Sequence, residues 1–156
     1  NAPKEGFDTL AKMVKKDGLI FIGLYNHISR LRTVLRQKVF SCLGKGILAE
    51  NFVKVFDPYA RSCANEPKKL NAWLNDQYRH PIESLHSMNE VHNWFEECGF
   101  ELVGSVPSLQ TISPQTVVSA EPINFDQMTS MLFETGALFG SNGSEGGLFL
   151  MVGRRV

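Results

Sequence analysis

Residues 19–25, with the sequence LIFIGLY, limit the possible folds of this chain more than any other segment. They form an unbroken apolar and aromatic run between the turn signal Asp17-Gly18 and the polar pair Asn26-His27. A strand that is apolar on both faces normally lies inside a sheet that helices cover on both sides. The run therefore predicts a buried strand of an α/β protein, whose neighbouring strands must be found elsewhere.

The elements predicted around this strand favour the same fold class. Helices are predicted from a first turn at Pro3 to an exit at Gly18, and at residues 28–43, 48–56, 67–74, 87–98 and 125–140; further strands are predicted at residues 100–107 and 148–155. Ser87 and Glu90 form a capping box, and Gly99 supplies a left-handed helix exit. This order of helices and strands predicts a layered α/β architecture within a single domain of 156 residues.

The apolar positions of these elements predict which side chains form the core. In the first two helices the inward residues are expected to be Phe7, Leu10, Ala11, Val14, Ile28, Leu31, Leu35 and Val39. In the later elements they are expected to be Trp94, Phe95, Phe100, Met128, Met131 and Leu132. We expect these aromatic and methionine side chains to pack in the core and not to bind a ligand.

The charge and the cysteine content argue against several classes of function. Sixteen basic and sixteen acidic residues give a formal net charge of zero, which gives no reason to expect binding to nucleic acid or a membrane surface. Cys42, Cys63 and Cys98 are odd in number and far apart, which fits a reducing cytoplasm and no disulfide scaffold. Zinc-ligand spacing and a bilayer-spanning apolar run are both missing, so we expect no metal site and no membrane partner. The basic stretch from Arg30 to Lys38 is predicted to be a solvated helix face and not an anion site.

Three segments of the chain follow one another in an order and spacing that are typical of one family. They are FDTLAKMVKKDGLIFIGLYN, EVHNWFEECGFELVGSVP and GGLFLMVGRR, at residues 7–26, 90–107 and 146–155. Together they resemble the C-terminal half of a class I S-adenosylmethionine-dependent methyltransferase. In that family a helix and a turn lead into strand five, a helix ending in Gly-Phe leads into strand six, and an antiparallel strand seven closes the sheet. The resemblance implies a partial Rossmann-like methyltransferase sheet of strands five, six and seven, packed by helices.

Part of that family's pattern does not occur in these residues. The acidic residue and Gly-x-Gly loop after strand one, which wrap the cofactor, are missing, and so is the acidic residue that binds the cofactor ribose. The resemblance therefore implies the C-terminal segment of a bacterial, cytoplasmic methyltransferase that contributes substrate-side elements. S-adenosylmethionine is expected to bind the full-length protein, and this part alone is expected to bind no cofactor and to be inactive. Residues 47–86 would be a helical insertion between strands.

In the intact family sheet, strand four would lie beside residues 19–25. Without strand four, a long apolar edge stays unpaired, and such an edge recruits another strand. We therefore expect two partners for this edge: the missing N-terminal half of the same chain in the full-length protein, and a second copy, as a two-fold homodimer, for this chain alone. In the alternative, N-terminal residues or the first helix fold over the edge.

The carboxyl end of this strand is the first candidate for a substrate site. Open α/β sheets bind ligands beyond the carboxyl ends of their parallel strands, which here carry Tyr25, Asn26 and His27. An asparagine amide both donates and accepts hydrogen bonds, and an imidazole exchanges protons near neutrality. An alternative role for Asn26 is to cap the helix that follows.

The segment DQYRHPIESLH, at residues 76–86, is the second candidate and resembles an insertion in a bacterial subgroup of the family. It carries Tyr78, His80, Glu83 and His86, which ionise or form hydrogen bonds. Methyl transfer requires an aligned nucleophile and sometimes the removal of a proton. Tyr78 or His80 is the candidate catalytic base, and Glu83 and His86 would bind the unknown methyl acceptor. In the structural alternative, His80 lies in a turn and Tyr78 stabilises the fold.

Two other classes of protein compete with this prediction. The first is a stand-alone, non-catalytic α/β module for binding or dimerisation. The second is a hydrolase-like α/β enzyme, against which the absence of a G-x-S-x-G nucleophile elbow argues. A reading frame that extends upstream of Asn1 by roughly 150 residues, with a Gly-rich loop after a strand, would favour the methyltransferase. A start codon close to Asn1 would favour the module.

Overall fold

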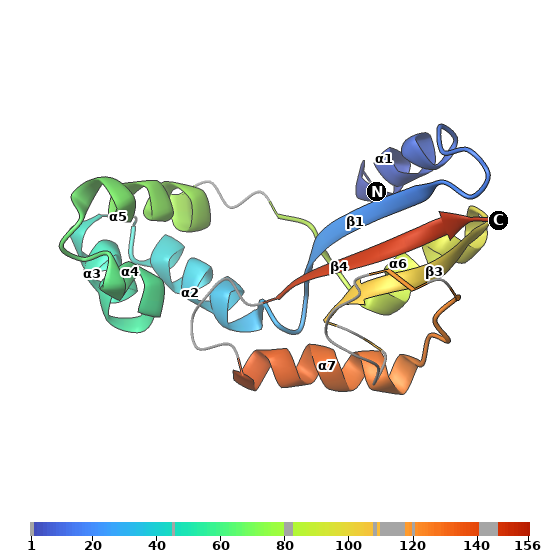
Figure 1. Cartoon of the computed structure of the whole chain (residues 1–156). Helices are drawn as coiled ribbons and strands as arrows, with labels where there is room; N and C mark the ends of the chain where they lie inside the picture. The colour runs from blue at the N-terminus through green and yellow to red at the C-terminus, as the bar shows by residue number, and fades with distance from the viewer. Residues whose placement is uncertain are drawn as a thin grey trace.

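An open sheet and a separate group of helices make up the described part of the chain (Figure 1). The structure, a computed structural model, describes residues 2–44, 46–79, 83–107, 109, 118–119, 121–140 and 147–156. The helices are α1 (Ala2–Ala11), α2 (Leu31–Cys42), α3 (Ile47–Phe56), α4 (Pro58–Ser62), α5 (Pro67–Leu74), the π-helix η1 (Asn75–Arg79), α6 (Met88–Glu97) and α7 (Gln127–Gly140). The strands are β1 (Leu19–Asn26), β2 (Leu85–His86), β3 (Phe100–Val106) and β4 (Leu148–Arg155).

The apolar run at residues 19–25 forms β1, so the prediction of a strand is confirmed. Within the described residues the sheet has four strands in the order β2-β1-β4-β3. Strand β4 lies between β1 and β3 and is antiparallel to both, whereas β2 is parallel to β1. The fold class is therefore α/β with an open mixed sheet packed by helices.

One side of β1 is only partly paired. Strand β2 contacts β1 at Tyr25 and Asn26, and no other residue in the described ranges pairs with that side. The Asn26 amide donates at 2.6 Å to the carbonyl of Gly147, the residue just before β4, and successive residues of an antiparallel ladder point to opposite sides. The backbone groups of Leu19, Phe21 and Gly23 therefore point toward the open side. The side of β1 that was expected to have no neighbouring strand is therefore paired with β2 at Tyr25 and Asn26 and is open along the rest of β1.

The opposite edge of the sheet is covered by the chain that follows β3. The amides of Ser119 and Ile123 donate to the carbonyls of Val103 and Leu102, each at 2.6 Å. A segment that satisfies the outer carbonyls of an edge strand protects this strand from pairing with other chains. Among the described residues, the β3 edge is therefore covered by another segment, whereas residues 19–23 of β1 have no such cover on their open side.

Helices α1 and α6 pack on one face of the sheet and form the main core with it. Phe7 of α1 lies 5.9 Å from Trp94 and 5.7 Å from Phe95, between ring centres. All three side chains are buried, and Phe100 of β3 lies in the same cluster, so the predicted aromatic core is confirmed. Leu10 was predicted to face inward but is exposed on the outer side of α1.

Strand β1 is not buried on both faces, which corrects the prediction from its composition. Ile20 lies in the core, but Leu19 and Phe21 point to the other face, and Phe21 is 55% exposed. The physical reason is that α1 and α6 share the core that contains Ile20. The apolar face with Leu19 and Phe21 is therefore available for contacts with other protein segments.

The second body is a group of short helices with a core of its own, at the left of Figure 1. Its buried residues are Phe40, Ala49, Val53, Ala60, Cys63, Leu70, Leu74 and Tyr78. Helices α3 and α5 confirm the predictions for residues 48–56 and 67–74, whereas α4 and η1 were not predicted. The expected insertion at residues 47–86 holds α3, α4, α5, η1 and β2, and α2 joins the same core from outside that range.

Helix α2 does not bury the face that its sequence predicted. Leu31 and Leu35 are exposed, although they were expected to face inward. The helix instead packs through Phe40, near its C-terminal end, against the group of short helices. Because Phe40 faces a core that forms only in the folded chain, apolar periodicity within α2 could not identify it.

Helix α7 shows a reversed pattern of burial. Met128, Met131 and Leu132 are exposed, although they were predicted to lie in the core, whereas Ser130 and Glu134 are buried. The two polar residues lie one turn apart and share the face that contacts the rest of the protein. The prediction was wrong because Glu134 forms hydrogen bonds with Met88 and Ser29, and these turn a polar face of α7 toward the rest of the protein.

Candidate functional site

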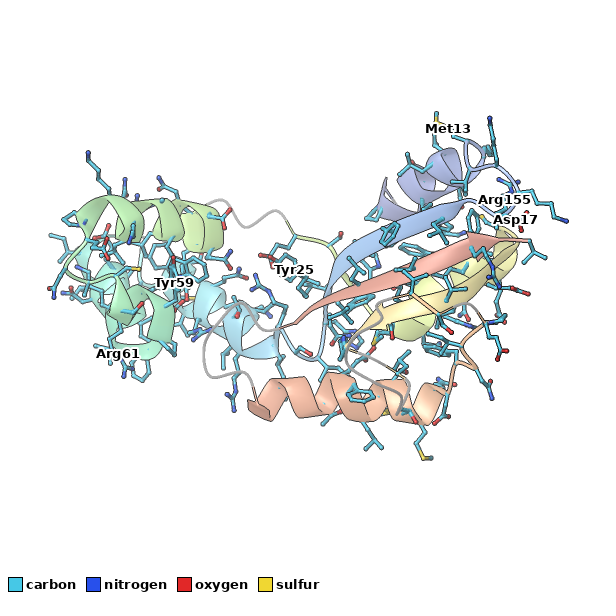
Figure 2. All side chains as sticks on the ribbon, in the orientation of Figure 1. Met13, Asp17, Tyr25, Tyr59, Arg61 and Arg155 are labelled. Atoms are coloured by element: carbon cyan, nitrogen blue, oxygen red, sulfur yellow. The ribbon has the colours of Figure 1, made fainter. Side chains whose placement is uncertain are left out.

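The carboxyl end of β1 brings together four segments of the chain. They are the turn at residues 27–30, strand β2, the N-terminus of α6 and the middle of α7, and hydrogen bonds connect them. Figure 2 shows Tyr25 at this end of β1, where the sheet meets the group of helices. Since open α/β sheets bind ligands beyond such strand ends, this region is the candidate functional site.

Asn26 stabilises the turn that follows β1. Its Oδ1 accepts hydrogen bonds from the amides of Ile28 and Ser29 at 2.9 and 3.0 Å, and its Nδ2 donates to the His86 carbonyl at 3.3 Å. The side chain is buried. These contacts support the capping role, because they hold the chain in the turn that leads into α2. His27 lies in the same turn and is exposed.

Arg30 is buried in the centre of the site, which corrects its assignment to a solvated helix face. It is 1% exposed. Its Nε donates to Glu83 at 3.2 Å, and its Nη2 donates to the other Glu83 oxygen and, at 2.9 Å, to Gln77. The guanidinium carbon also lies 4.4 Å from the centre of the Tyr25 ring, in cation–π geometry. Two predicted substrate-binding residues, Tyr25 and Glu83, are therefore both partners of Arg30.

His86 is held in place by α6. Its Nδ1 lies 2.9 Å from the Glu90 carboxylate, and its ring meets the Trp94 ring edge-on with centres 5.2 Å apart. A carboxylate only accepts, so Nδ1 carries the proton. The Nε2 atom is buried and has no hydrogen-bond partner among the described residues. The Ser87 hydroxyl accepts from the Glu90 amide as the capping box predicts, but the Glu90 carboxylate turns to His86 and not to the Ser87 amide.

Tyr78 lies away from this site, in the core of the helical body. Its hydroxyl donates to Asp57 at 2.5 Å, and Asp57 also accepts from the Trp73 indole at 3.1 Å. Burial, and then the hydrogen bond to Asp57, raise the pKa of the Tyr78 hydroxyl. These contacts favour the structural alternative for Tyr78 over a catalytic base. His80, the other candidate base, lies outside the described residues.

Glu134 belongs to the site but was not identified from the sequence. Its Oε1 accepts from the Met88 amide at 2.8 Å, at the N-terminus of α6, and its carbonyl accepts from the Ser29 hydroxyl at 2.9 Å. A cavity of about 40 Å³ lies beside it, lined in part by Phe133 and Phe149. The sequence offered one indication of this role. Glu134 lies one turn after Ser130, on a face of α7 that has few other polar side chains.

The site offers no cluster of metal ligands within the described residues, where no three His, Cys, Asp or Glu side chains are close enough to hold an ion. In the same residues, no helix is long and apolar enough to cross a bilayer. No protein-family model matches the chain, and no curated protein is significantly similar to it in sequence. A functional assignment therefore depends on the residues and contacts described above.

Proposed function

We propose that this chain is the C-terminal part of a class I S-adenosylmethionine-dependent methyltransferase and contributes substrate-side elements to it. The proposal is supported by the resemblance of its three segments, by the order of helices and strands, and by a last strand that is antiparallel to both neighbours. The sheet would then be a partial Rossmann-like sheet, with β1, β3 and β4 as strands five, six and seven.

The open side of β1 is the observation that carries this proposal. The backbone groups of Leu19, Phe21 and Gly23 have no strand partner on that side within the described residues, and the side chains of Leu19 and Phe21 are exposed. An apolar edge of this kind is normally covered, because it pairs readily with other chains. Strand four, supplied by a preceding half of the same polypeptide, would cover it.

The described residues around the carboxyl end of β1 do not fit the cofactor itself. The cavity of about 40 Å³ holds a group of only a few atoms. Pockets for ligands of drug or cofactor size are typically about 300–1,000 Å³. The proposal therefore assigns cofactor binding to the preceding half of the polypeptide, and no methyl transfer to the 156-residue chain alone.

Within the proposal, the carboxyl end of β1 faces the methyl acceptor. His27 is exposed there and offers an imidazole, while Asn26 and Arg30 fix the backbone around it. His86 offers a buried Nε2 whose ring is oriented by Glu90. The exposed His27 imidazole would take up the proton that the acceptor loses, and the buried groups would hold the surrounding backbone in place.

Calorimetry with S-adenosylhomocysteine tests the proposal. We expect no binding to the 156-residue chain and one binding site in the full-length methyltransferase that the proposal implies. The ligand is the demethylated product of the cofactor, so binding does not depend on knowing the methyl acceptor. A longer protein that does not bind it, or a short chain that does, would contradict the proposal.

A stand-alone α/β module for binding or dimerisation is the alternative. The observation in its favour is that the sheet body and the helical body each contain a buried core of their own. The gene sequence upstream of Asn1 separates the two proposals. A start codon close to Asn1 would favour the module, and a reading frame that encodes a Gly-rich loop after a strand would favour the methyltransferase.

A further inference from the structure

A buried carboxylate on α7 lies beside the small cavity at the carboxyl end of β1. Glu134 is 6% exposed, and its Oε1 accepts from the Met88 amide at 2.8 Å. The Glu134 carbonyl accepts from the Ser29 hydroxyl at 2.9 Å. Met88 and Ser29 are both buried, and they lie on different segments. The side chain and the backbone of Glu134 are therefore both held by fixed neighbours.

The other carboxylate oxygen of Glu134 lacks a donor. Neither a hydrogen bond nor an ion pair reaches Oε2 from any residue in the described ranges. Oε2 is not among the fully enclosed side-chain atoms that lack a partner, so this oxygen remains accessible to a small ligand. The positive end of the α6 dipole makes this a favourable place for a negative group, but it does not supply the missing donor.

The cavity beside Glu134 has the size and lining for a small cationic group. Its volume is about 40 Å³, which is enough for a group of a few atoms or for one to three water molecules. Phe133 and Phe149 line it and provide apolar surface for the carbon atoms of a ligand. Leu148 and Phe133 are partly exposed, so that the cavity is accessible from the surface.

We propose that this cavity binds the ammonium group of a primary amine. One N–H of the ligand donates to the Glu134 carboxylate, and the adjoining carbon packs against Phe133 and Phe149. This inference goes beyond the proposed function, because it holds whether or not the chain takes part in methyl transfer. If the proposed function is also correct, the amine belongs to the methyl acceptor.

The test is a titration of the 156-residue chain with methylammonium chloride, followed by ¹H–¹⁵N NMR at constant ionic strength. We expect saturable shifts of the Met88 and Phe149 amides. A ligand with two non-hydrogen atoms is limited to a Kd of about 10 mM or weaker. Glu134→Gln keeps an acceptor for the Met88 amide but removes the charge, and it should weaken binding at least about tenfold.

Two further variants make the outcome decisive. Glu101→Gln changes a carboxylate that pairs with Arg154 at 3.4 Å, near the opposite end of β3, and should bind like the unchanged chain. Phe133→Leu removes one ring and keeps Glu134, so it should also weaken methylammonium binding. This variant serves as the test if Glu134→Gln does not fold. Shifts that do not saturate, as expected for a cavity that holds only water, would overturn the proposal. Equal binding by Glu134→Gln would overturn it as well.

The methylammonium titration tests the amine site, and the calorimetry with S-adenosylhomocysteine tests the methyltransferase. A negative result in one experiment does not affect the other proposal. A longer protein without cofactor binding removes the methyltransferase but leaves the amine site standing. A chain that does not bind methylammonium removes the amine site and says nothing against the methyltransferase.

Discussion

Asp57 shows how a single buried carboxylate organises a group of short helices. It accepts from the amides of Tyr59 and Ala60 at the start of α4, from the Trp73 indole of α5 and from the Tyr78 hydroxyl of η1. Short helices are marginal by themselves, and their stability comes mostly from tertiary contacts. We therefore expect the side chains that donate to Asp57 to matter more for stability than their helix propensities suggest.

Replacing Tyr78 with Phe tests this role. The change removes a buried hydrogen bond and should lower the free energy of unfolding by about 1–2 kcal/mol. Urea unfolding followed by circular dichroism measures the difference. Tyr59→Phe is the matched control, because an exposed hydroxyl can exchange a lost contact for one with water, and the Tyr59 ring stays packed against Trp73. A loss in the control as large as that in Tyr78→Phe would contradict the prediction.

The same variant should change how stability depends on pH. Burial, followed by the hydrogen bond to Asp57, raises the pKa of Tyr78 above its ordinary value of 10.0, so the folded chain holds this proton more tightly than the unfolded chain. The resulting stability is complete below pH 10 and is lost as the pH rises above it, by up to about 1.4 kcal/mol per pH unit. Tyr78→Phe should lack this loss, so its stability should approach that of the unchanged chain as the pH rises. A constant difference between the two would contradict the assignment.

At the scale of elements, the chain treats the two edges of its sheet differently. Beside β3, the amides of Ser119 and Ile123 satisfy outer carbonyls, whereas β2 covers only the last residues of β1. No charged residue or proline interrupts β1, although these are the usual protection of an edge strand. The open part of β1 is therefore the place where association with another chain is most favourable.

We predict that the 156-residue chain alone forms a homodimer through this edge. Sedimentation at protein concentrations of about tens of micromolar should show the dimer. Phe21→Lys places a charge on the open edge and should shift the chain toward the monomer. Leu132→Lys, at an exposed position of α7, is the control and should leave the association unchanged. A stable monomer of the unchanged chain, or an equal effect of both variants, would rule this dimer out.

At the scale of the whole molecule, Arg30 and Glu83 connect the sheet body to the helical body. Arg30 follows β1 and precedes α2, Glu83 lies between η1 and β2, and Gln77 of η1 completes the contact. The charged ends of Arg30 and Glu83 are largely removed from water, with side-chain exposures of 2% and 17%. Removing one partner of such a pair leaves an uncompensated buried charge, which is more costly than removing both.

Glu83→Leu should therefore lower the free energy of unfolding by about 3–5 kcal/mol, because it leaves the Arg30 charge buried without its partner. Urea unfolding measures this loss. The double variant Arg30→Met, Glu83→Leu should be less destabilised than Glu83→Leu alone. Glu50→Leu breaks a more exposed pair with Arg79 and should cost only about 1 kcal/mol or less. If the double variant is less stable than Glu83→Leu alone, the prediction is wrong. The Arg30–Glu83 pair would then contribute more to the free energy of unfolding than the burial of its two charges costs.

Features that depend on neighbouring residues were predictable from the sequence. The apolar run forms β1, and the Ser87 cap begins α6. Gly99, with a φ of 71°, follows the end of α6. The aromatic stripe of Trp94 and Phe95 is buried as its spacing predicts. Turns, caps and helix stripes act over one or two turns of chain, so their signals lie in adjacent residues. The likeness to a methyltransferase rests on such local segments and stays a prediction.

The composition of the candidate site was decided only by contacts between distant segments. Arg30 is buried because Glu83 reaches it from beyond the helical body, and Glu134 is buried because its carboxylate meets the start of α6. For the same reason α7 buries polar side chains and exposes Met128, against its apolar pattern. A buried charged group is stable only where its hydrogen-bond partners are in place, and the position of those partners is a property of the folded chain.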